Sequence, residues 1–277
     1  TEDYNGARQE GFGRSQMTIR RGRRCSAAVA YLRPALARPN LEVATRALAT
    51  RIVLEGGRAI GVEYLSGGAR TMARAEREVI LAGGVVNSPQ LLMLSGIGDP
   101  AQLSGQGIAV RVALPGVGRN LQDHVCVAVG YARKEPGPLH RKMRADRIAV
   151  ELGKTYFRGA GIAGDQPHGL MAFLKTVPAV PLPDIQLLFN AAPMAAAPYF
   201  APLVQPYADG FACRIVLLRP QSRGRIELAS ADPRRPVRIR QNFLATEKDW
   251  ATLRAGLRLV RDIGRQTALR PFAAGEI

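Results

Sequence analysis

Residues 77–124 read REVILAGGVVNSPQLLMLSGIGDPAQLSGQGIAVRVALPGVGRNLQDH, and this stretch decides the fold of the chain. The apolar run from Glu78 to Ala82 predicts a short buried strand, and Gly83 and Gly84 predict a turn directly after it. A strand, a glycine turn and a helix start together bind anions, because the backbone is open and free N–H groups point outward. Many α/β proteins have such a turn and bind nothing there, so the pattern alone leaves both interpretations open.

The helix expected after this turn has recognisable boundary signals. Asn87 or Ser88 is placed to cap it, and Pro89 is placed to occupy its first position. A leucine-rich run supplies its apolar side, and Gly96 is placed to end it. The stretch therefore predicts a strand–turn–helix unit of an α/β nucleotide-binding fold.

Composition bounds the class of protein. The 277 residues suffice for two domains, and 47% hydrophobic with 22% charged residues is typical of globular chains. A formal charge of +17 raises the possibility of nucleic-acid binding. However, the arginines are spread along the chain, which favours a solvated face, or a preference for phosphates and for an acidic segment outside the chain. No apolar run of about 18 residues predicts a membrane span.

Cysteine usage indicates the compartment. Cys25, Cys126 and Cys213 are odd in number and form no CxxC pair, which argues against a zinc site and against a disulfide framework. We therefore expect no metal and a cytoplasmic location, with attachment at the surface of the inner membrane left open.

The segments before the glycine turn have the spacing of a nucleotide-binding domain interrupted by a meander. Residues 1–24 are expected to be irregular, 26–36 helical and 41–45 a strand. Glycine pairs separate a strand at 50–55, a second at 59–65 and a third short strand that leads into Arg77.

After His124 the pattern changes to strands joined by loops. This series predicts an antiparallel sheet, with strands at 125–131, 169–175, 184–190, 210–218 and 225–229. Helical spacing covers Arg141 to Arg158. A last helix over 246–266 is expected to be capped by Thr246, with Trp250 in the core together with Leu253, Leu257 and Val260.

Several motifs, in order, resemble one known family. They are the run from Gly83 to Gly98, LPGVG at 114–118, NLQDH at 120–124, and the opening segments DYNG at 3–6 and GRRCSAA at 22–28. The segments SRGRI at 222–226, ADP at 231–233 and RQNFL at 240–244 fit as well. Together they resemble the glucose–methanol–choline (GMC) family of flavin oxidoreductases, nearest its choline-dehydrogenase-like branch. Gly84 stands where alanine is usual in that family, and Cys25 where another residue is common.

The resemblance implies a fold class of α/β plus α+β. It places a partial FAD-binding nucleotide fold with a β-meander at 1–124, and an antiparallel-sheet substrate domain at 125–277. FAD is the implied cofactor. The implied cofactor-binding residues are Val43, beside the adenine through its backbone, and Ala82, Gly83, Gly84 and Ser88 at the diphosphate or ribose. Val43 can equally be a core valine.

The implied chemistry is oxidation of CH–OH groups of alcohols, choline among them. A base takes the hydroxyl proton while hydride moves to flavin N5. This chain has neither the family's GxGxxG nor its late histidine motif, so we assign no catalytic residue within it and expect an internal fragment that is inactive alone. Asp123 and His124 could form a dyad, but the resemblance favours a structural role; His140 and His168 are expected to be solvated or packed.

Two other function classes remain. The chain could be a catalytically inactive fragment that acts as a binding or interaction module, and bound yellow flavin would distinguish the two. A nucleic-acid-binding role rests on charge alone and would require a salt-dependent, sequence-specific affinity. The expected partner is a small-molecule alcohol, while the particular alcohol and the electron acceptor are left open.

Overall fold

The computed structural model describes residues 1–164 and 169–277, so the interpretation of His168 lies outside the described residues. The chain divides into two units. The first, called here the sheet unit, contains 1–38, 124–221 and 246–277; the second, the meander unit, contains 39–123 and 222–245. The expected single boundary at 124 therefore differs from the structure, in which two segments join the other unit.

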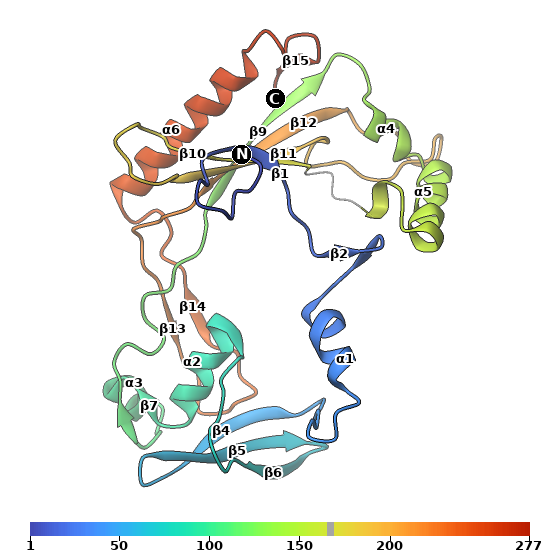
Figure 1. The fold of residues 1–277 in the computed structure, drawn as a ribbon. Coiled ribbons are helices and arrows are strands. Elements are labelled where there is room, and N and C mark those ends of the chain that lie inside the picture. Colours follow the sequence, from blue (N-terminus) through green and yellow to red (C-terminus); the bar gives the residue numbers. More distant parts are fainter. Residues whose placement is uncertain (165–168) are drawn as a thin grey trace. The chain divides into compact units, whose positions relative to one another are not determined.

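An antiparallel sheet of six strands forms the centre of the sheet unit (Figure 1). The antiparallel sheet expected after His124 is confirmed. In spatial order the strands are β1 (Gly11–Arg14), β10 (Leu170–Leu174), β11 (Ile185–Asn190), β12 (Gly210–Leu217), β9 (Cys126–Arg133) and β15 (Ala273–Glu276).

Helix α6 (Glu247–Gly264) packs on one face of this sheet, against β9, β11 and β12 (Figure 1). Gly256 allows the close approach, because a Cβ there would lie 2.7 Å from Cγ2 of Ile215. The predicted cap is confirmed: the Thr246 hydroxyl accepts from the backbone N–H of Asp249 at 3.4 Å. The prediction of Trp250 in the core is wrong, since the residue is 45% exposed while Leu253 and Val260 are buried.

The first 38 residues belong to the sheet unit, which corrects the expectation that residues 1–24 are irregular. Strand β1 pairs with β10 along the sheet edge. Tyr4 is buried against Phe173, with ring centroids 5.4 Å apart, and its hydroxyl accepts from the N–H of Gln16 at 2.7 Å. The GFGR sequence of β1 has no apolar alternation, and the pairing depends on backbone groups that every sequence carries.

The remaining short elements of the sheet unit differ in detail from the expected ones. The helix expected at 26–36 forms as a π-helix (Ala28–Leu32) followed by α1 (Arg33–Ala35), after the small hairpin of β2 (Ile19–Arg20) and β3 (Arg23–Arg24). The expected helix at 141–158 is divided into α4 (Pro138–Lys142) and α5 (Ala145–Arg158), with the 3₁₀ turn Ile162–Gly164 after it.

Tyr199 marks the division between α4 and α5. Its carbonyl accepts from the N–H of Ala145 at 2.8 Å, and its N–H donates to the carbonyl of Met143 at 3.2 Å. These bonds with a distant segment replace the helical bonds that a continuous helix would make. His140, one turn earlier, is buried between the rings of Tyr199 and Tyr207, as the packed alternative predicted.

The meander unit contains the predicted meander and a small helical layer. The three-stranded antiparallel meander consists of β4 (Leu48–Glu55), β5 (Arg58–Ser66) and β6 (Ala69–Arg74), which confirms the prediction. The rest of the unit comprises α2 (Gly84–Leu94), β7 (Ile97–Gly98), α3 (Pro100–Gly105), β8 (Val112–Ala113), β13 (Arg225–Glu227) and β14 (Arg238–Arg240).

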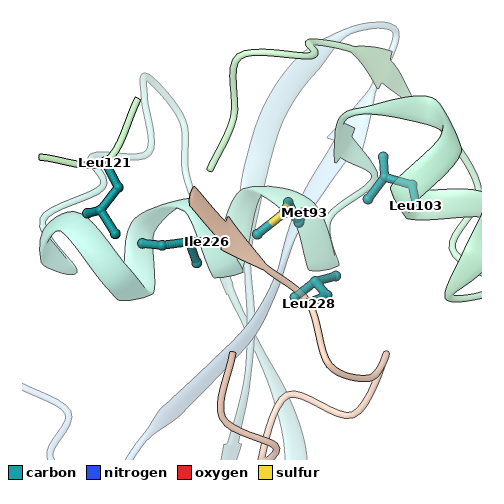
Figure 2. Close-up of a cluster of buried hydrophobic side chains, with 5 residues drawn as sticks. All are labelled: Met93, Leu103, Leu121, Ile226 and Leu228. Atoms are coloured by element: carbon teal, nitrogen blue, oxygen red, sulfur yellow. The ribbon is translucent and has the colours of Figure 1, made fainter. Parts of the chain in front are cut away.

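A cluster of five buried side chains explains why residues 222–245 belong to this unit. Figure 2 shows the cluster, which consists of Met93, Leu103, Leu121, Ile226 and Leu228. Ile226 and Leu228 lie two positions apart and therefore point to the same side of the β13 segment. The strand expected at 225–229 thus forms, but it pairs with β14 and does not extend the six-stranded sheet.

Two segments of the meander unit that were expected to be strands, 41–45 and 78–82, are not strands in the structure. A strand is defined by its hydrogen-bonded partner, and neither segment pairs with another among the described residues. Their apolar side chains are correspondingly open: Val43 is 43% and Ile80 is 78% exposed.

Candidate functional site

A cavity of about 250 Å³ lies at the start of helix α2, where the glycine turn was predicted to bind an anion. It brings together the first residues of β4, the end of the apolar run before the turn, and the exposed side of the helix. Its lining consists of Leu48, Ala49, Leu81, Gly83, Asn87, Ser88, Gln90, Leu91, Leu94 and Pro233.

The glycine pair keeps the entrance to α2 open. Gly83 is the N-cap residue and no side chain caps the helix. A Cβ on Gly83 would lie 3.3 Å from the backbone nitrogen of Ser88 and 3.4 Å from its hydroxyl oxygen. Gly84 has φ +79°, which favours glycine, and a Cβ there would meet nothing within 4 Å. The backbone N–H groups of the first turn are therefore accessible to a ligand.

The helix begins one turn earlier than its sequence signals indicated. It starts at Gly84, so that Pro89 lies inside it, and Asn87 and Ser88 are helical residues, not caps. Pro89 has no N–H to donate to the carbonyl of Val85, so one helical bond is lost. Packing of Val86 from the added turn against the cluster in Figure 2 compensates. The C-terminal prediction is correct: Gly96, with φ +81°, follows the Ser95 cap.

Side-chain hydrogen bonds hold α2 beside β4 and beside the 222–245 segment. The Ser95 hydroxyl accepts from the N–H of Ile52 at 2.8 Å and donates to the carbonyl of Leu91 at 2.6 Å. Gln90 donates from its Nε2 to the carbonyl of Arg235 at 3.0 Å. These contacts fix the helix start relative to Leu48 and Pro233, so the cavity is a defined feature of the unit.

The structure gathers only some of the predicted cofactor-binding residues. Gly83 and Ser88 line the cavity, and Ala82 and Gly84 flank Gly83 at the same turn. Val43 lies in the unpaired segment before β4 and does not line the cavity.

Sequence analysis missed several lining residues. Asn87 could have been identified, because it lies four residues after Gly83 on the same helix face. Leu48, Ala49 and Pro233 have no local signal, since tertiary contacts alone bring them to the helix.

Two family models described as GMC oxidoreductase match residues 1–126 and 220–276, and the first contains the glycine turn and the start of α2. The chain belongs to the GMC oxidoreductase family. The matched regions cover the meander unit and most of the segments whose motifs indicated the resemblance.

Relatives of this GMC oxidoreductase chain include two enzymes named for choline. The oxygen-dependent choline dehydrogenase of Brucella anthropi is 43% identical over 277 residues, which cover all of this chain and 50% of the relative. The mitochondrial choline dehydrogenase of Homo sapiens is 42% identical over 279 residues, covering all of this chain and 46% of the relative. The chain thus spans about half the length of the curated relatives it matches.

Solved structures of the family have the same fold. Pyridoxine 4-oxidase from Mesorbium loti matches with a TM-score of 0.79 at 26% identity, over 97% of this chain and 49% of that structure. A formate oxidase of Aspergillus oryzae matches with a TM-score of 0.80 at 24% identity, over 96% and 50%. The second likeness concerns the fold alone.

Other reactive groups of this GMC oxidoreductase chain lie away from the glycine turn. Asp123 and His124 are exposed where the chain passes between the two units. Burial raises the pKa of the Cys213 thiol to about 12, so it stays protonated and unreactive at neutral pH. No group of three potential metal ligands occurs within residues 1–164 and 169–277, and no helix in those ranges is long and apolar enough to cross a membrane.

Proposed function

We propose that this chain supplies part of an FAD-dependent oxidoreductase that acts on CH–OH groups of alcohols, in the manner of choline dehydrogenases. The observation that carries the proposal is the uncapped, glycine-lined start of α2, which opens into a cavity formed by residues from three parts of the meander unit. The whole-length similarity to two choline dehydrogenases supports the substrate class.

The residues at the cavity fit a phosphate-bearing cofactor. The lining contains no carboxylate, and the positive end of the helix dipole favours an anion at Gly83. Gly83 and Gly84 let a diphosphate or ribose approach the backbone, Ala82 presents its backbone at the same turn, and the Ser88 hydroxyl is a further donor. A cavity of about 250 Å³ accommodates only part of a dinucleotide. Val43 would approach the adenine through its backbone.

Each unit has its own role in the proposal. FAD, when bound, supplies the acceptor for the hydride released from the alcohol carbon. The meander unit holds and orients the cofactor through backbone N–H groups, and the sheet unit provides a wall of the substrate pocket. We assign no catalytic base within this chain. The three cysteines without disulfides support a reducing compartment, and we propose a cytoplasmic location on that ground.

The test is flavin retention in purified protein that contains these 277 residues. We expect yellow flavin absorption that an alcohol such as choline bleaches under anaerobic conditions. Gly83→Leu should lower FAD retention at least about tenfold, because the added side chain enters the space in front of Ser88. Gly105→Leu is the matched control, since a Cβ at Gly105 meets nothing within 4 Å and the site lies at the end of α3.

The outcomes distinguish the two function classes. Folded protein without flavin, and without affinity for added FAD, would favour a non-catalytic interaction module. Unchanged FAD affinity in a folded Gly83→Leu variant would remove the turn from the cofactor site, whatever the activity of the enzyme.

A further inference from the structure

A second cavity of the meander unit, of about 590 Å³, is surrounded by arginines. Its lining consists of Arg119, Asn120, Arg223, Gly224, Arg225, Arg240 and Asn242. We propose that this cavity, called here the arginine cavity, binds a small soluble anion bearing a phosphate or diphosphate group. It shares no lining residue with the cavity at the start of α2, so the proposal does not rest on flavin binding.

The strand register places two of these arginines face to face. Arg225 of β13 lies directly opposite Arg240 of β14 in the antiparallel pair. Like charges in this position repel and destabilise a sheet unless an anion compensates. Glu227 is the one carboxylate bonded to both, accepting from Nε of Arg225 at 3.0 Å and from Nε of Arg240 at 2.8 Å. Two guanidinium groups therefore share a single negative charge.

The contacts with Glu227 leave donors available for a ligand. A guanidinium group has five N–H donors, and these bonds use only the Nε of each arginine. The terminal nitrogens of Arg225 and Arg240 form the planar fork that matches phosphate oxygens two at a time. About half of each side chain is exposed, so an entering anion can reach them.

Arg119 contributes positive charge from the opposite wall. It donates from its terminal nitrogen to Asp99 at 2.8 Å and from Nε to the carbonyl of Pro115 at 3.0 Å. Asp99 and Glu227 lie outside the lining, which contains four guanidinium groups and no carboxylate. A cavity of this composition favours anions over neutral or cationic ligands.

The backbone around the arginine cavity is fixed before any ligand arrives. Leu121 and Gly224 exchange backbone hydrogen bonds of 3.0 and 2.8 Å, and a Cβ on Gly224 would lie 2.2 Å from the carbonyl oxygen of Arg240. Asn242 donates from Nδ2 to the carbonyl of Arg223 at 3.0 Å. Binding a ligand therefore costs little ordering of the backbone.

The size and chemistry of the cavity define the ligand class. About 590 Å³ lies within the range of roughly 300–1,000 Å³ that small-molecule sites occupy. The arginine forks select oxyanions, and the two asparagine side chains can donate to or accept from polar groups of the rest of the ligand. A phospholipid headgroup has the same chemistry, so the experiment must separate a free ligand from a membrane surface.

The experiment measures pyrophosphate binding to the purified protein by isothermal titration calorimetry at low salt. The double variant Arg225→Gln/Arg240→Gln should weaken binding at least about tenfold, because it removes charge-assisted bonds to the ligand. Arg234→Gln is the matched control: it removes one arginine of the same unit that pairs with Asp232 outside the lining, and it should leave binding unchanged.

Two further variants keep the result interpretable. If the melting temperature shows that the double variant unfolds, Arg240→Gln alone replaces it, since Arg225 then still neutralises Glu227. Gly83→Leu should leave pyrophosphate binding unchanged, which separates the arginine cavity from the proposed flavin site. Vesicles of phosphatidylglycerol should bind no better than vesicles of phosphatidylcholine.

Three results would overturn the proposal. One is the absence of pyrophosphate binding to the unaltered protein. Another is an equal loss of affinity in Arg234→Gln, which would reduce the effect to overall charge. The third is binding to phosphatidylglycerol vesicles with no binding of free pyrophosphate, which would make the surface a membrane contact.

Discussion

The two units treat similar sequences differently. In the sheet unit, the apolar segment at 185–190 became a fully paired strand, and Ile185 is completely buried beneath α6. In the meander unit, the apolar segment at 78–82 has no strand partner among the described residues, and Ile80 is 78% exposed. Alternation and β-branched residues thus indicate a preference for extended backbone, whereas pairing and burial decide whether a strand forms.

The comparison is tested most strongly by removing one isoleucine from each region. In the 277-residue chain, Ile215→Ala should lower the free energy of unfolding toward the upper end of roughly 2–5 kcal/mol, because Ile215 is fully buried against α6. Ile80→Ala should change it by no more than about 0.5 kcal/mol. Urea unfolding followed by circular dichroism measures both. Equal losses would mean that the 78–82 segment is covered in solution.

The core in Figure 2 should be the part of the meander unit that behaves like the sheet unit. Met93→Ala should cost roughly 2–4 kcal/mol, since Met93 is buried at the centre of the cluster. Hydrogen exchange should become faster in α2 and in residues 225–228 together, because both surround the cavity created. Val85→Ala, at an exposed position of the same helix, is the control. Faster exchange confined to α2 would contradict the joining of 222–245 to this unit.

The cap of α6 gives a smaller test in the sheet unit. Thr246→Ala should lower stability by about 0.5–2 kcal/mol, because the N–H of Asp249 loses its acceptor at the helix start. Thr71→Ala, an exposed threonine of β6, should have a much smaller effect. Thermal unfolding compares the two variants. A loss as large for Thr71 would show that the Thr246 contact has no special importance.

The smallest expected effect is a change in one titration in the meander unit. The hydrogen bond from Arg119, followed by the backbone N–H groups at the start of α3, holds the pKa of Asp99 below its usual 3.8. Because the folded-state value is depressed, the stabilisation is present above the unfolded value and is lost as pH falls through the folded one. In Arg119→Gln, the pKa of Asp99 should rise toward 3.8, measured by NMR titration of the carboxyl group. An unmoved pKa would mean that the backbone bonds alone depress it.

Local signals predicted the elements whose causes are local. The meander was found because glycine pairs separate its strands, and α6 because Thr246 and a periodic apolar face mark it. The candidate site was only partly predicted. Gly83 and Ser88 follow from the turn and the helix start, whereas Leu48 and Pro233 reach the cavity through tertiary contacts alone.

The sequence by itself determined the family, the antiparallel strands after His124 and the position of the glycine turn, because motifs and short-range periodicity carry that information. Tertiary structure alone decided which unit each segment joins. Residues 11–14 entered the six-stranded sheet through backbone pairing, and residues 225–228 left it because Ile226 and Leu228 pack on Met93. The arginine cavity arose in the same way, since its lining comes from chain segments about a hundred residues apart. Backbone pairing and long-range packing depend on partners that no local window of sequence contains.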